Sequence, residues 1–243
     1  MTYLSYEEND NFKGDGSKNA KGQDLEAFLN SYNPKDYDNP CNTVDTAVFG
    51  YEEIPSEGNP IQVGLRIKNI LLVKRSNHPS IGEWAIPGGF VEYREDLDDA
   101  ARRELEEETN ISGILPVQIS THGDPKRDPR ARLITTLYGA LVPASRLNPR
   151  AGDDACEAEL FDIEVELINE EILSDRKRIY TYSLELVCEK TDEELYGEVA
   201  KIIESDGLIN TCRYEKIFSK GIAVDHSKLI LDAFLFIKGL LVN

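Results

Sequence analysis

Residues 89–111 read GFVEYREDLDDAARRELEEETNI and constrain the fold of this chain more than any other stretch. Residues 96–109 contain no proline or glycine and are rich in alanine, leucine, arginine and glutamate, so they are predicted to form a helix. Glu107 and Glu108 follow Glu104 by three and four positions, which places the three carboxylates on one helix face. Such a group suits hard cations, which prefer oxygen ligands. The alternative is that these glutamates only form a solvated helix face.

The same stretch fits the Nudix box, the pattern Gly-x5-Glu-x7-Arg-Glu-U-x-Glu-Glu-x-Gly-U, in which U is an apolar residue. Asn110 stands where the pattern has glycine, and asparagine is the next residue after glycine in left-handed helix stops. The chain therefore resembles the Nudix hydrolases. The resemblance implies an α/β fold, the Nudix α/β/α sandwich with a mixed sheet, and cleavage of a nucleoside diphosphate linked to another group. The matched positions are Gly89, Glu95, Arg103, Glu104, Leu105, Glu107, Glu108 and Ile111.

The resemblance also implies roles for the residues of the box. Glu104, Glu107 and Glu108 would hold Mg²⁺ or Mn²⁺ across the diphosphate, and the backbone carbonyl of Gly89 would be a further ligand. The metal would neutralise the diphosphate and lower the pKa of an attacking water. The pair that would brace the helix is Glu95 and Arg103.

Residues 28–165 and 222–240 resemble one Nudix branch, which holds ADP-ribose pyrophosphatases and related transcription regulators. The segments that carry this resemblance include FLNSYNPKDYDNPCNTVDTAVF, GDPKRDPRARLITTLYGALVP and GIAVDHSKLILDAF. They imply hydrolysis of ADP-ribose to AMP and ribose 5-phosphate. The alternatives are a nucleotide sensor without turnover, a DNA-binding regulator, and an enzyme that acts on NADH, dinucleoside polyphosphates or sugar nucleotides. The regulators carry a winged-helix domain after the last Nudix helix. Residues 225–239 resemble that helix here, and the sequence ends soon after them. We therefore expect an enzyme.

A basic loop, residues 123–132 (GDPKRDPRAR), stands out in an otherwise acidic chain. Arg127, Arg130 and Arg132 are expected to contact the diphosphate or the distal ribose phosphate. Arginine suits this role because its fork of donors matches phosphate oxygens. The alternative is ordinary salt bridging with the aspartates of the same loop.

The remaining site candidates are aromatic and acidic residues outside the box. Trp84, the single tryptophan, is expected either to fill the core or to form a wall for the nucleobase. Tyr37 is expected either to stack on adenine or to pack within a turn. In AGDDACEAEL, Asp153, Asp154 and Glu157 are the candidates for the loop carboxylate that activates water, unless they form only a solvated acidic loop.

Charge and hydropathy limit the partners that we expect. The formal net charge of −18 repels phosphate backbones, so no nucleic acid is expected to bind. Residues 1–20 are polar, which predicts no signal peptide, and residues 229–242 are too short and too charged to span a membrane. Four scattered cysteines are typical of reduced thiols in a cytoplasmic protein. We therefore expect a cytoplasmic protein that binds a small nucleotide.

We expect residues 1–42 to form a tail and cover segment, and residues 43–243 to form one Nudix domain with an insertion at about residues 167–220. Residues 192–205 are predicted to be helical because their large apolar residues fall on one side. The apolar residues 224–241 are predicted to form a final helix that either belongs to the core or joins the insertion in a homodimer interface. Further elements are predicted as a helix at 25–32 and strands at 43–51, 61–67, 70–74, 117–121, 133–142, 159–166, 176–190 and 212–218.

Overall fold

The computed structural model describes residues 12, 14–56, 59–151 and 155–241. The chain divides into two compact units, Met1–Asn39 and Pro40–Asn243, which are described separately. The first unit contains helix α1 (Leu25–Ser31), whose N-terminus is capped by the Asp24 side chain accepting the Ala27 N–H. A short 3-10 helix, Pro34–Asp36, follows it. The predicted short helix before Pro34 is confirmed.

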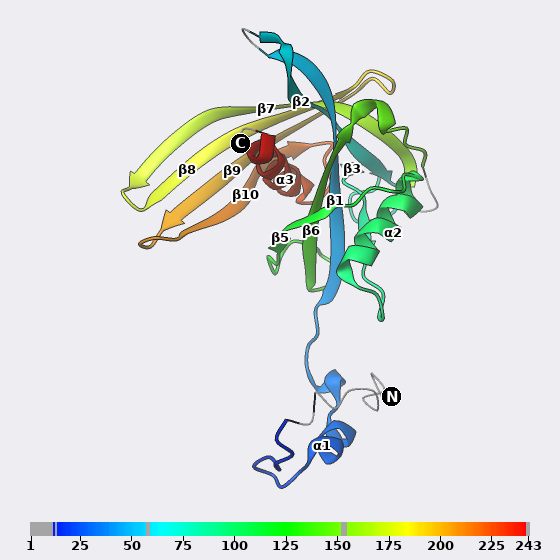
Figure 1. Ribbon diagram of the computed structural model, residues 1–243, viewed down its shortest axis with the longest axis vertical. Coiled ribbons are helices and arrows are strands. Elements are labelled where there is room, and N and C mark those ends of the chain that lie inside the picture. Colours follow the sequence, from blue (N-terminus) through cyan, green and yellow to red (C-terminus); the bar gives the residue numbers. More distant parts are fainter. Residues whose placement is uncertain (1–11, 13, 57–58, 152–154, 242–243) are drawn as a thin grey trace. The chain divides into compact units, whose positions relative to one another are not determined.

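The second unit is built on one ten-stranded mixed sheet (Figure 1). Its strands follow the order β10-β9-β8-β7-β2-β1-β6-β5, with the short β3 on β2 and β4 on β1. β1 and β6 pair in parallel, whereas the other strand pairs are antiparallel. The strands are β1 Cys41–Ser56, β2 Asn59–Arg75, β3 Trp84–Ala85, β4 Gly88–Phe90, β5 Val117–His122, β6 Leu133–Pro143, β7 Ala155–Ser174, β8 Lys177–Cys188, β9 Glu193–Ser205 and β10 Asn210–Lys220.

Two helices, α2 (Leu97–Thr109) and α3 (His226–Leu241), cover opposite faces of this sheet. Alternate strand residues point to opposite faces. Val48 and Leu71 accordingly pack with Leu105 of α2, whereas Phe49 and Ile70 pack in the larger core that contains α3. The helix–sheet–helix arrangement confirms the predicted Nudix α/β/α sandwich.

The ends of α2 follow from its own sequence. Asp96 caps the N-terminus by accepting the Asp98 N–H, and Asn110 ends the helix with a left-handed backbone at φ 55°. The Asn110 N–H bonds to the Glu106 carbonyl at 2.8 Å, which satisfies one of the last helical acceptors. The predicted helix is confirmed, and asparagine performs the role that glycine has in the Nudix pattern.

The insertion is all strand, so the helix predicted at residues 192–205 is wrong. These residues form β9, which is hydrogen-bonded to β8 on one side and β10 on the other. Leu195, Gly197 and Val199 are buried in alternation, as on a strand that is covered on one face. Gly197 disfavours a helix and brings β9 close to α3, where an added Cβ would lie 3.3 Å from the Ser227 Cβ.

Two other predicted elements are longer in the structure. The strands predicted at residues 61–67 and 70–74 are one strand, β2. The strand predicted at residues 159–166 extends through β7 to Ser174 and pairs with β8. The insertion therefore continues the Nudix sheet, which supports our proposal that residues 43–243 form one domain.

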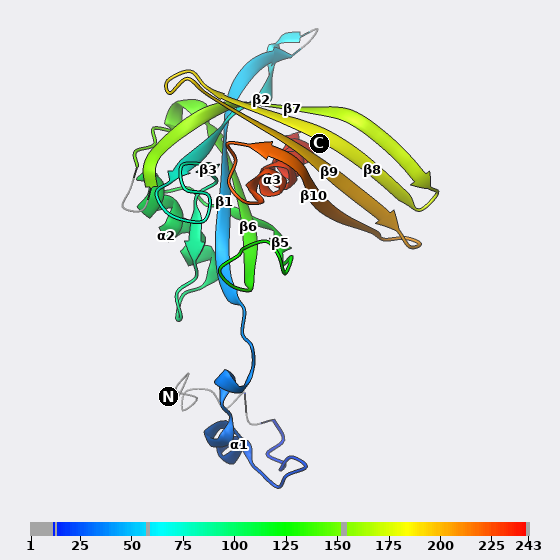
Figure 2. The same ribbon diagram turned by 180° about the vertical axis from the view of Figure 1, so that it is seen from behind.

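The strands β7 to β10 curve around α3 (Figure 2). Leu229, Ile230, Ala233 and Phe234 of α3 are buried, so most of this helix belongs to the core. Burial of each large apolar side chain stabilises the fold by roughly 1.5–3 kcal/mol. In the part of the chain that the structure describes, no helix is long and apolar enough to cross a bilayer.

The carboxylate of Asp232 on α3 links the helix to the edge strand β5. Its Oδ2 accepts hydrogen bonds from the Ser120 hydroxyl at 2.6 Å and from the His122 ring at 3.1 Å. Burial raises the pKa of Asp232, but the hydrogen bonds from His122, Ser120 and Tyr214 outweigh it and hold the pKa below its usual range. Because Tyr214 lies on β10, one α3 side chain contacts both edges of the sheet.

Candidate active site

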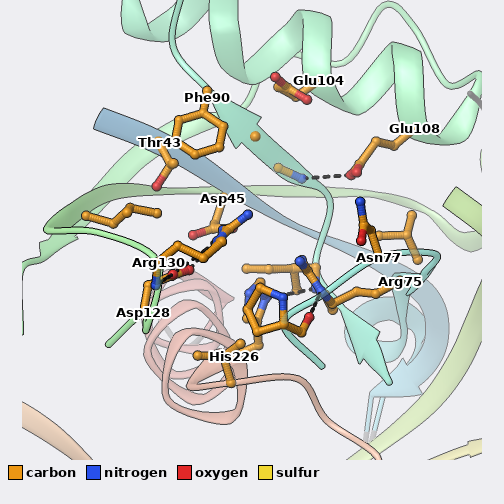
Figure 3. A pocket seen from close by; sticks show the side chains of 18 of the residues that line it. Thr43, Asp45, Arg75, Asn77, Phe90, Glu104, Glu108, Asp128, Arg130 and His226 are labelled. Atoms are coloured by element: carbon orange, nitrogen blue, oxygen red, sulfur yellow. Dashed lines mark hydrogen bonds and ion pairs between the residues drawn. The ribbon is translucent and has the colours of Figure 1, made fainter. Parts of the chain in front are cut away.

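A pocket of about 550 Å³ lies where β1, β2 and β4 meet α2, the β5–β6 loop and the start of α3 (Figure 3). Its volume falls within the usual range for sites that bind small molecules. Glu104 and Glu108 project into it from α2, and Arg75, Arg130 and His226 lie on the opposite wall. The pocket therefore combines carboxylates and arginines across a gap of ligand size.

The two carboxylates from α2 lie in a poorly solvated environment. Burial is the main cause that raises the pKa of Glu108 to about 8, and the nearby carboxylates of Glu104 and Asp45 add to the shift. The Gly88 N–H donates to Glu108 Oε2 at 2.9 Å and partly offsets it. Burial likewise raises the pKa of Glu104. Positive charge placed beside this pair would stabilise both ionised carboxylates.

The two glycines that precede α2 leave no room for side chains. A Cβ on Gly89 would lie 2.4 Å from the carboxylate of Glu104, and one on Gly88 would lie 2.2 Å from the Val44 carbonyl oxygen. The backbone of β4 therefore approaches both the glutamates and β1 as closely as glycine allows. Any side chain at position 89 would displace the Glu104 carboxylate.

Arg103 holds the carboxylates of α2 together. Its Nε and Nη2 each bond to Glu95 at 2.8 Å, and its Nη1 bonds to Glu104 at 2.7 Å and to Glu107 at 2.9 Å. These contacts raise the pKa of Arg103, the bond with Glu95 contributing most. The Glu95–Arg103 pair thus lies where it braces the helix against β4.

The carboxylates of the pocket suit a divalent cation that takes some of its ligands from the protein and the others from a substrate. Among the described residues, no three His, Cys, Asp or Glu side chains are already gathered as one metal-binding group. Mg²⁺ usually takes one or two carboxylates and completes its shell with water and substrate phosphates. Glu104 and Glu108 meet this requirement, and their raised pKa values indicate a need for positive charge.

The arginines of the β5–β6 loop lie in three different environments. Arg127 is buried in ion pairs, with its Nη2 3.2 Å from Asp225 Oδ1 and 3.6 Å from Asp45 Oδ2. Arg130 reaches the pocket and donates to both oxygens of Asp128, at 3.1 and 2.9 Å. Arg132 bonds to the backbone carbonyls of its own loop and does not line the pocket.

The profile of the NUDIX domain matches residues 63–182. This stretch of the chain is a Nudix domain. The ADPR responsive transcriptional repressor NtrR of Acinetobacter baylyi is 40% identical over 119 residues, which are 48% of this chain and 43% of the repressor. The ADP-ribose pyrophosphatase of Methanocaldococcus jannaschii is 39% identical over 113 residues, 45% of this chain and 66% of that enzyme. The chain thus spans less than two thirds of the length of each relative.

A solved structure extends the Nudix likeness beyond the profile. The MutT/nudix family protein from Enterococcus faecalis aligns with a TM-score of 0.58 at 25% identity. The alignment covers 89% of this chain and 70% of the other. The similarity therefore includes much of the chain outside residues 63–182.

Two other predicted site residues, Trp84 and Glu157, do not line the described pocket. Trp84 is fully buried and packs edge-to-face on Phe161 at 4.7 Å, so it fills the core and cannot form a wall for a base. Glu157 forms an ion pair with Lys74 at 3.3 Å on the neighbouring strand. Tyr37 belongs to the first unit and stacks on Tyr32. Asp154, like Asp153, lies outside the described residues.

The sequence analysis missed several pocket residues, among them Asp45, Arg75, Phe90 and His226. Phe90 directly follows the two glycines, and an aromatic residue at such a loop–strand junction is a signal that could have been used. His226 begins α3 in the segment GIAVDH, where its Nδ1 accepts the Ile86 N–H at 3.2 Å. Burial lowers the pKa of His226, which favours the neutral ring with its proton on Nε2.

Proposed function

We propose that this protein hydrolyses ADP-ribose to AMP and ribose 5-phosphate with Mg²⁺ or Mn²⁺. The observation that carries the proposal is the pocket of about 550 Å³ in which Glu104 and Glu108 lie across from arginine side chains. Such a site matches a diphosphate, which needs cations along its length and a metal at the reacting bond. Two relatives support the choice of ADP-ribose, since one is named an ADP-ribose pyrophosphatase and the other an ADPR responsive repressor.

We propose metal-binding roles for residues of β4 and α2. Glu104, Glu107, Glu108 and the Gly89 carbonyl would hold the metal, which when bound neutralises the diphosphate and activates water. The Gly88 N–H orients Glu108, and Arg103 orients Glu104 and Glu107. Glu107 is hydrogen-bonded to Arg103 in the structure, so it would have to break this bond to join Glu104 and Glu108 as a metal ligand.

We assign the diphosphate contact to Arg75 in place of Arg127 and Arg132. Among the described residues that line the pocket, Arg75 makes no ion pair, and its Nε donates to the Pro79 carbonyl at 2.7 Å. Its charge also lowers the pKa of Glu108, which indicates that the two side chains lie near each other. A guanidinium beside the metal site can donate to a phosphate oxygen with charge assistance.

We also propose Glu92 as the residue that accepts a proton from the attacking water, in place of Glu157. Glu92 lines the pocket and is exposed, and its carboxylate makes no hydrogen bond or ion pair with the described residues. The other pocket carboxylates outside α2 are held in ion pairs by arginines. A carboxylate without a partner is free to act as a general base.

A panel of nucleotides tests the proposed reaction. The purified protein with Mg²⁺ is expected to hydrolyse ADP-ribose with a kcat/KM at least about ten-fold above that for nucleoside triphosphates, the effect of one charge-assisted contact. Chelation by EDTA is expected to stop the reaction. Far better hydrolysis of NADH, dinucleoside polyphosphates or sugar nucleotides would contradict the substrate assignment and leave the Nudix assignment intact.

The repressor relative favours a second candidate function, a nucleotide-responsive DNA-binding protein. We retain the proposal that no nucleic acid binds, because the net charge of −18 disfavours contact with a phosphate backbone. The same preparation titrated with labelled duplex DNA at physiological salt, with and without ADP-ribose, distinguishes the two functions. Tight sequence-selective binding would favour the repressor function.

We further propose a homodimer formed through the strands of the insertion. Several large apolar side chains are exposed on these strands. Monomeric proteins usually expose such side chains singly, whereas groups of them often mark a protein–protein interface. Light scattering is expected to give about twice the chain mass of 27.3 kDa, and a monomer at micromolar concentration would contradict the proposal. The exposed residues are Leu167, Ile168, Ile172, Leu173, Leu208, Ile209, Ile217 and Phe218.

A further inference from the structure

Phe90 is an aromatic side chain that lines a polar pocket and is left open. It is 48% exposed, whereas Trp84, six residues earlier, is fully buried. The guanidinium carbon of Arg130 lies 5.7 Å from the centre of the Phe90 ring, which is cation–π distance. One face of the ring is thus partly covered by Arg130, and the exposed remainder is available to a ligand.

The orientation of Arg130 is fixed by Asp128. Arg130 Nε and Nη2 donate to the two oxygens of Asp128, and the Arg130 backbone N–H donates to Oδ1 at 2.8 Å. Burial raises the pKa of Asp128, but its hydrogen bonds with Arg130 outweigh it and hold the pKa below its usual range. Because the Nε and Nη2 edge of the Arg130 guanidinium is already bonded to Asp128, the guanidinium is less able to bind a phosphate in bidentate fashion. Its flat face can still stack on an aromatic ring.

The backbone of Phe90 is held equally firmly. Phe90 is paired with Thr43 of β1, and its carbonyl accepts a hydrogen bond from Arg103 Nη2 at 3.0 Å. The same Arg103 holds Glu104, and the residue before Phe90 is Gly89, where an added Cβ would lie 2.4 Å from the Glu104 carboxylate. A flat group stacked on Phe90 would therefore lie next to the residue whose backbone approaches the Glu104 carboxylate.

We propose that Phe90 is the stacking surface for the nucleobase and that Arg130 is a positioning residue that covers the other side of the ring. This inference rests on the proposed nucleotide substrate and deepens it. A ring with a cation near one face attracts an electron-rich purine on the other. Stacking of this kind recognises any aromatic base, since every base has a π-face. The pair therefore selects for the presence of a base and discriminates little between bases.

The kinetic test combines two variants with two substrates. Phe90→Ala and Phe90→Leu are expected to raise KM for ADP-ribose about ten- to a hundred-fold, the usual effect of one lost base stack, with kcat nearly unchanged. The second substrate is an abasic analogue of ADP-ribose that carries 1-O-methyl ribose in place of adenosine. The wild-type KM for this analogue is expected to be high already and unchanged by either variant. Phe90→Tyr is expected to retain the wild-type KM for ADP-ribose.

Arg130→Ala separates stacking from phosphate contact. If Arg130 acts through Phe90, the variant raises KM for ADP-ribose and leaves KM for the abasic analogue unchanged. An equal rise with both substrates would overturn the positioning role and assign Arg130 to the phosphates. Leu115→Ala is the control, since Leu115 is 75% exposed and does not line the pocket.

Binding of AMP, measured by calorimetry without hydrolysis, separates this inference from the proposed reaction. If no nucleoside diphosphate derivative is hydrolysed but AMP binds the wild type and not Phe90→Ala, the reaction proposal fails and the base site stands. If ADP-ribose is hydrolysed and Phe90→Ala changes neither KM nor AMP affinity, the base site is overturned and the reaction stands. Absence of both hydrolysis and AMP binding would overturn both.

Discussion

Glu108→Gln is expected to lower kcat for ADP-ribose by about a hundred-fold or more, the effect of losing a key electrostatic group in an active site. Glu108 is partly buried beside Glu104, so solvent screens its charge less than on an exposed surface. Glutamine retains an oxygen that can accept the Gly88 N–H, so the variant is expected to stay folded. Initial rates at saturating Mg²⁺, with circular dichroism to check the fold, measure both effects.

Two companion variants sharpen this test. Glu106→Gln is the matched control, because Glu106 lies on the same helix, is exposed and does not line the pocket. Gly89→Ala leaves every carboxylate in the sequence but forces the Glu104 carboxylate to move, so it is expected to reduce kcat as well. Near-normal turnover of Glu108→Gln at saturating Mg²⁺ would show that Glu108 is not a metal ligand.

Arg127→Met is expected to lower the free energy of unfolding by about 3–5 kcal/mol, the usual result of removing one partner from a buried ion pair. Arg127 compensates both Asp225 and Asp45, and all three side chains are buried. Methionine retains the apolar volume but removes the Arg127 charge from both carboxylates; among the described residues, Lys228 still forms an ion pair with Asp225 at 3.0 Å. Urea unfolding followed by the fluorescence of the buried Trp84 measures the change.

The pH dependence gives this prediction a second readout. Burial raises the pKa of Asp225, but the positive charges of Arg127 and Lys228 outweigh it and hold the folded pKa below its usual value. Asp225 therefore stabilises the wild type above the unfolded pKa of about 3.9, and this stability is lost as the pH falls through the folded pKa. Without Arg127 the folded pKa of Asp225 rises, so the stability deficit of the variant should shrink as Asp225 becomes protonated.

Two further variants decide whether the ion pair is responsible. Arg127→Met combined with Asp225→Asn is expected to recover part of the lost stability, since fewer buried charges remain unpaired. Arg102→Met is the control, because Arg102 pairs with Asp99 on the exposed surface of α2 and should change stability little. A wild-type unfolding midpoint for Arg127→Met would show that Arg127 is free to serve the substrate.

The residues predicted best from the sequence depend on their close neighbours. Helix α2, its cap at Asp96 and its stop at Asn110 were predictable because a few consecutive residues determine them. Strand β9 was not, because the spacing of Leu195, Val199 and Ile202 fits a helix as well as a strand. Pairing with β8 and β10 decides between the two, and no single segment contains that information.

The candidate site divides in the same way. The carboxylates of α2 could be assigned because one helix face carries them. The opposite wall could not, because Asp45, Arg75 and His226 are brought together only by the sheet and by α3. Trp84 and Phe90 make the point clearly: only tertiary packing reveals that the tryptophan is enclosed and the phenylalanine is open.

The pocket draws on residues from Thr43 to His226, and this span bears on how the protein is made. On the ribosome, the glutamates that we propose as metal ligands emerge long before the segment that carries Asp225 and His226. A nascent chain that ends before Gly221 would lack the Arg127–Asp225 ion pair and the hydrogen bond from the Ile86 N–H to His226. The chain would thus carry these glutamates for a large part of its synthesis without a finished pocket, and the proposed hydrolysis would begin only after α3 packs on the sheet.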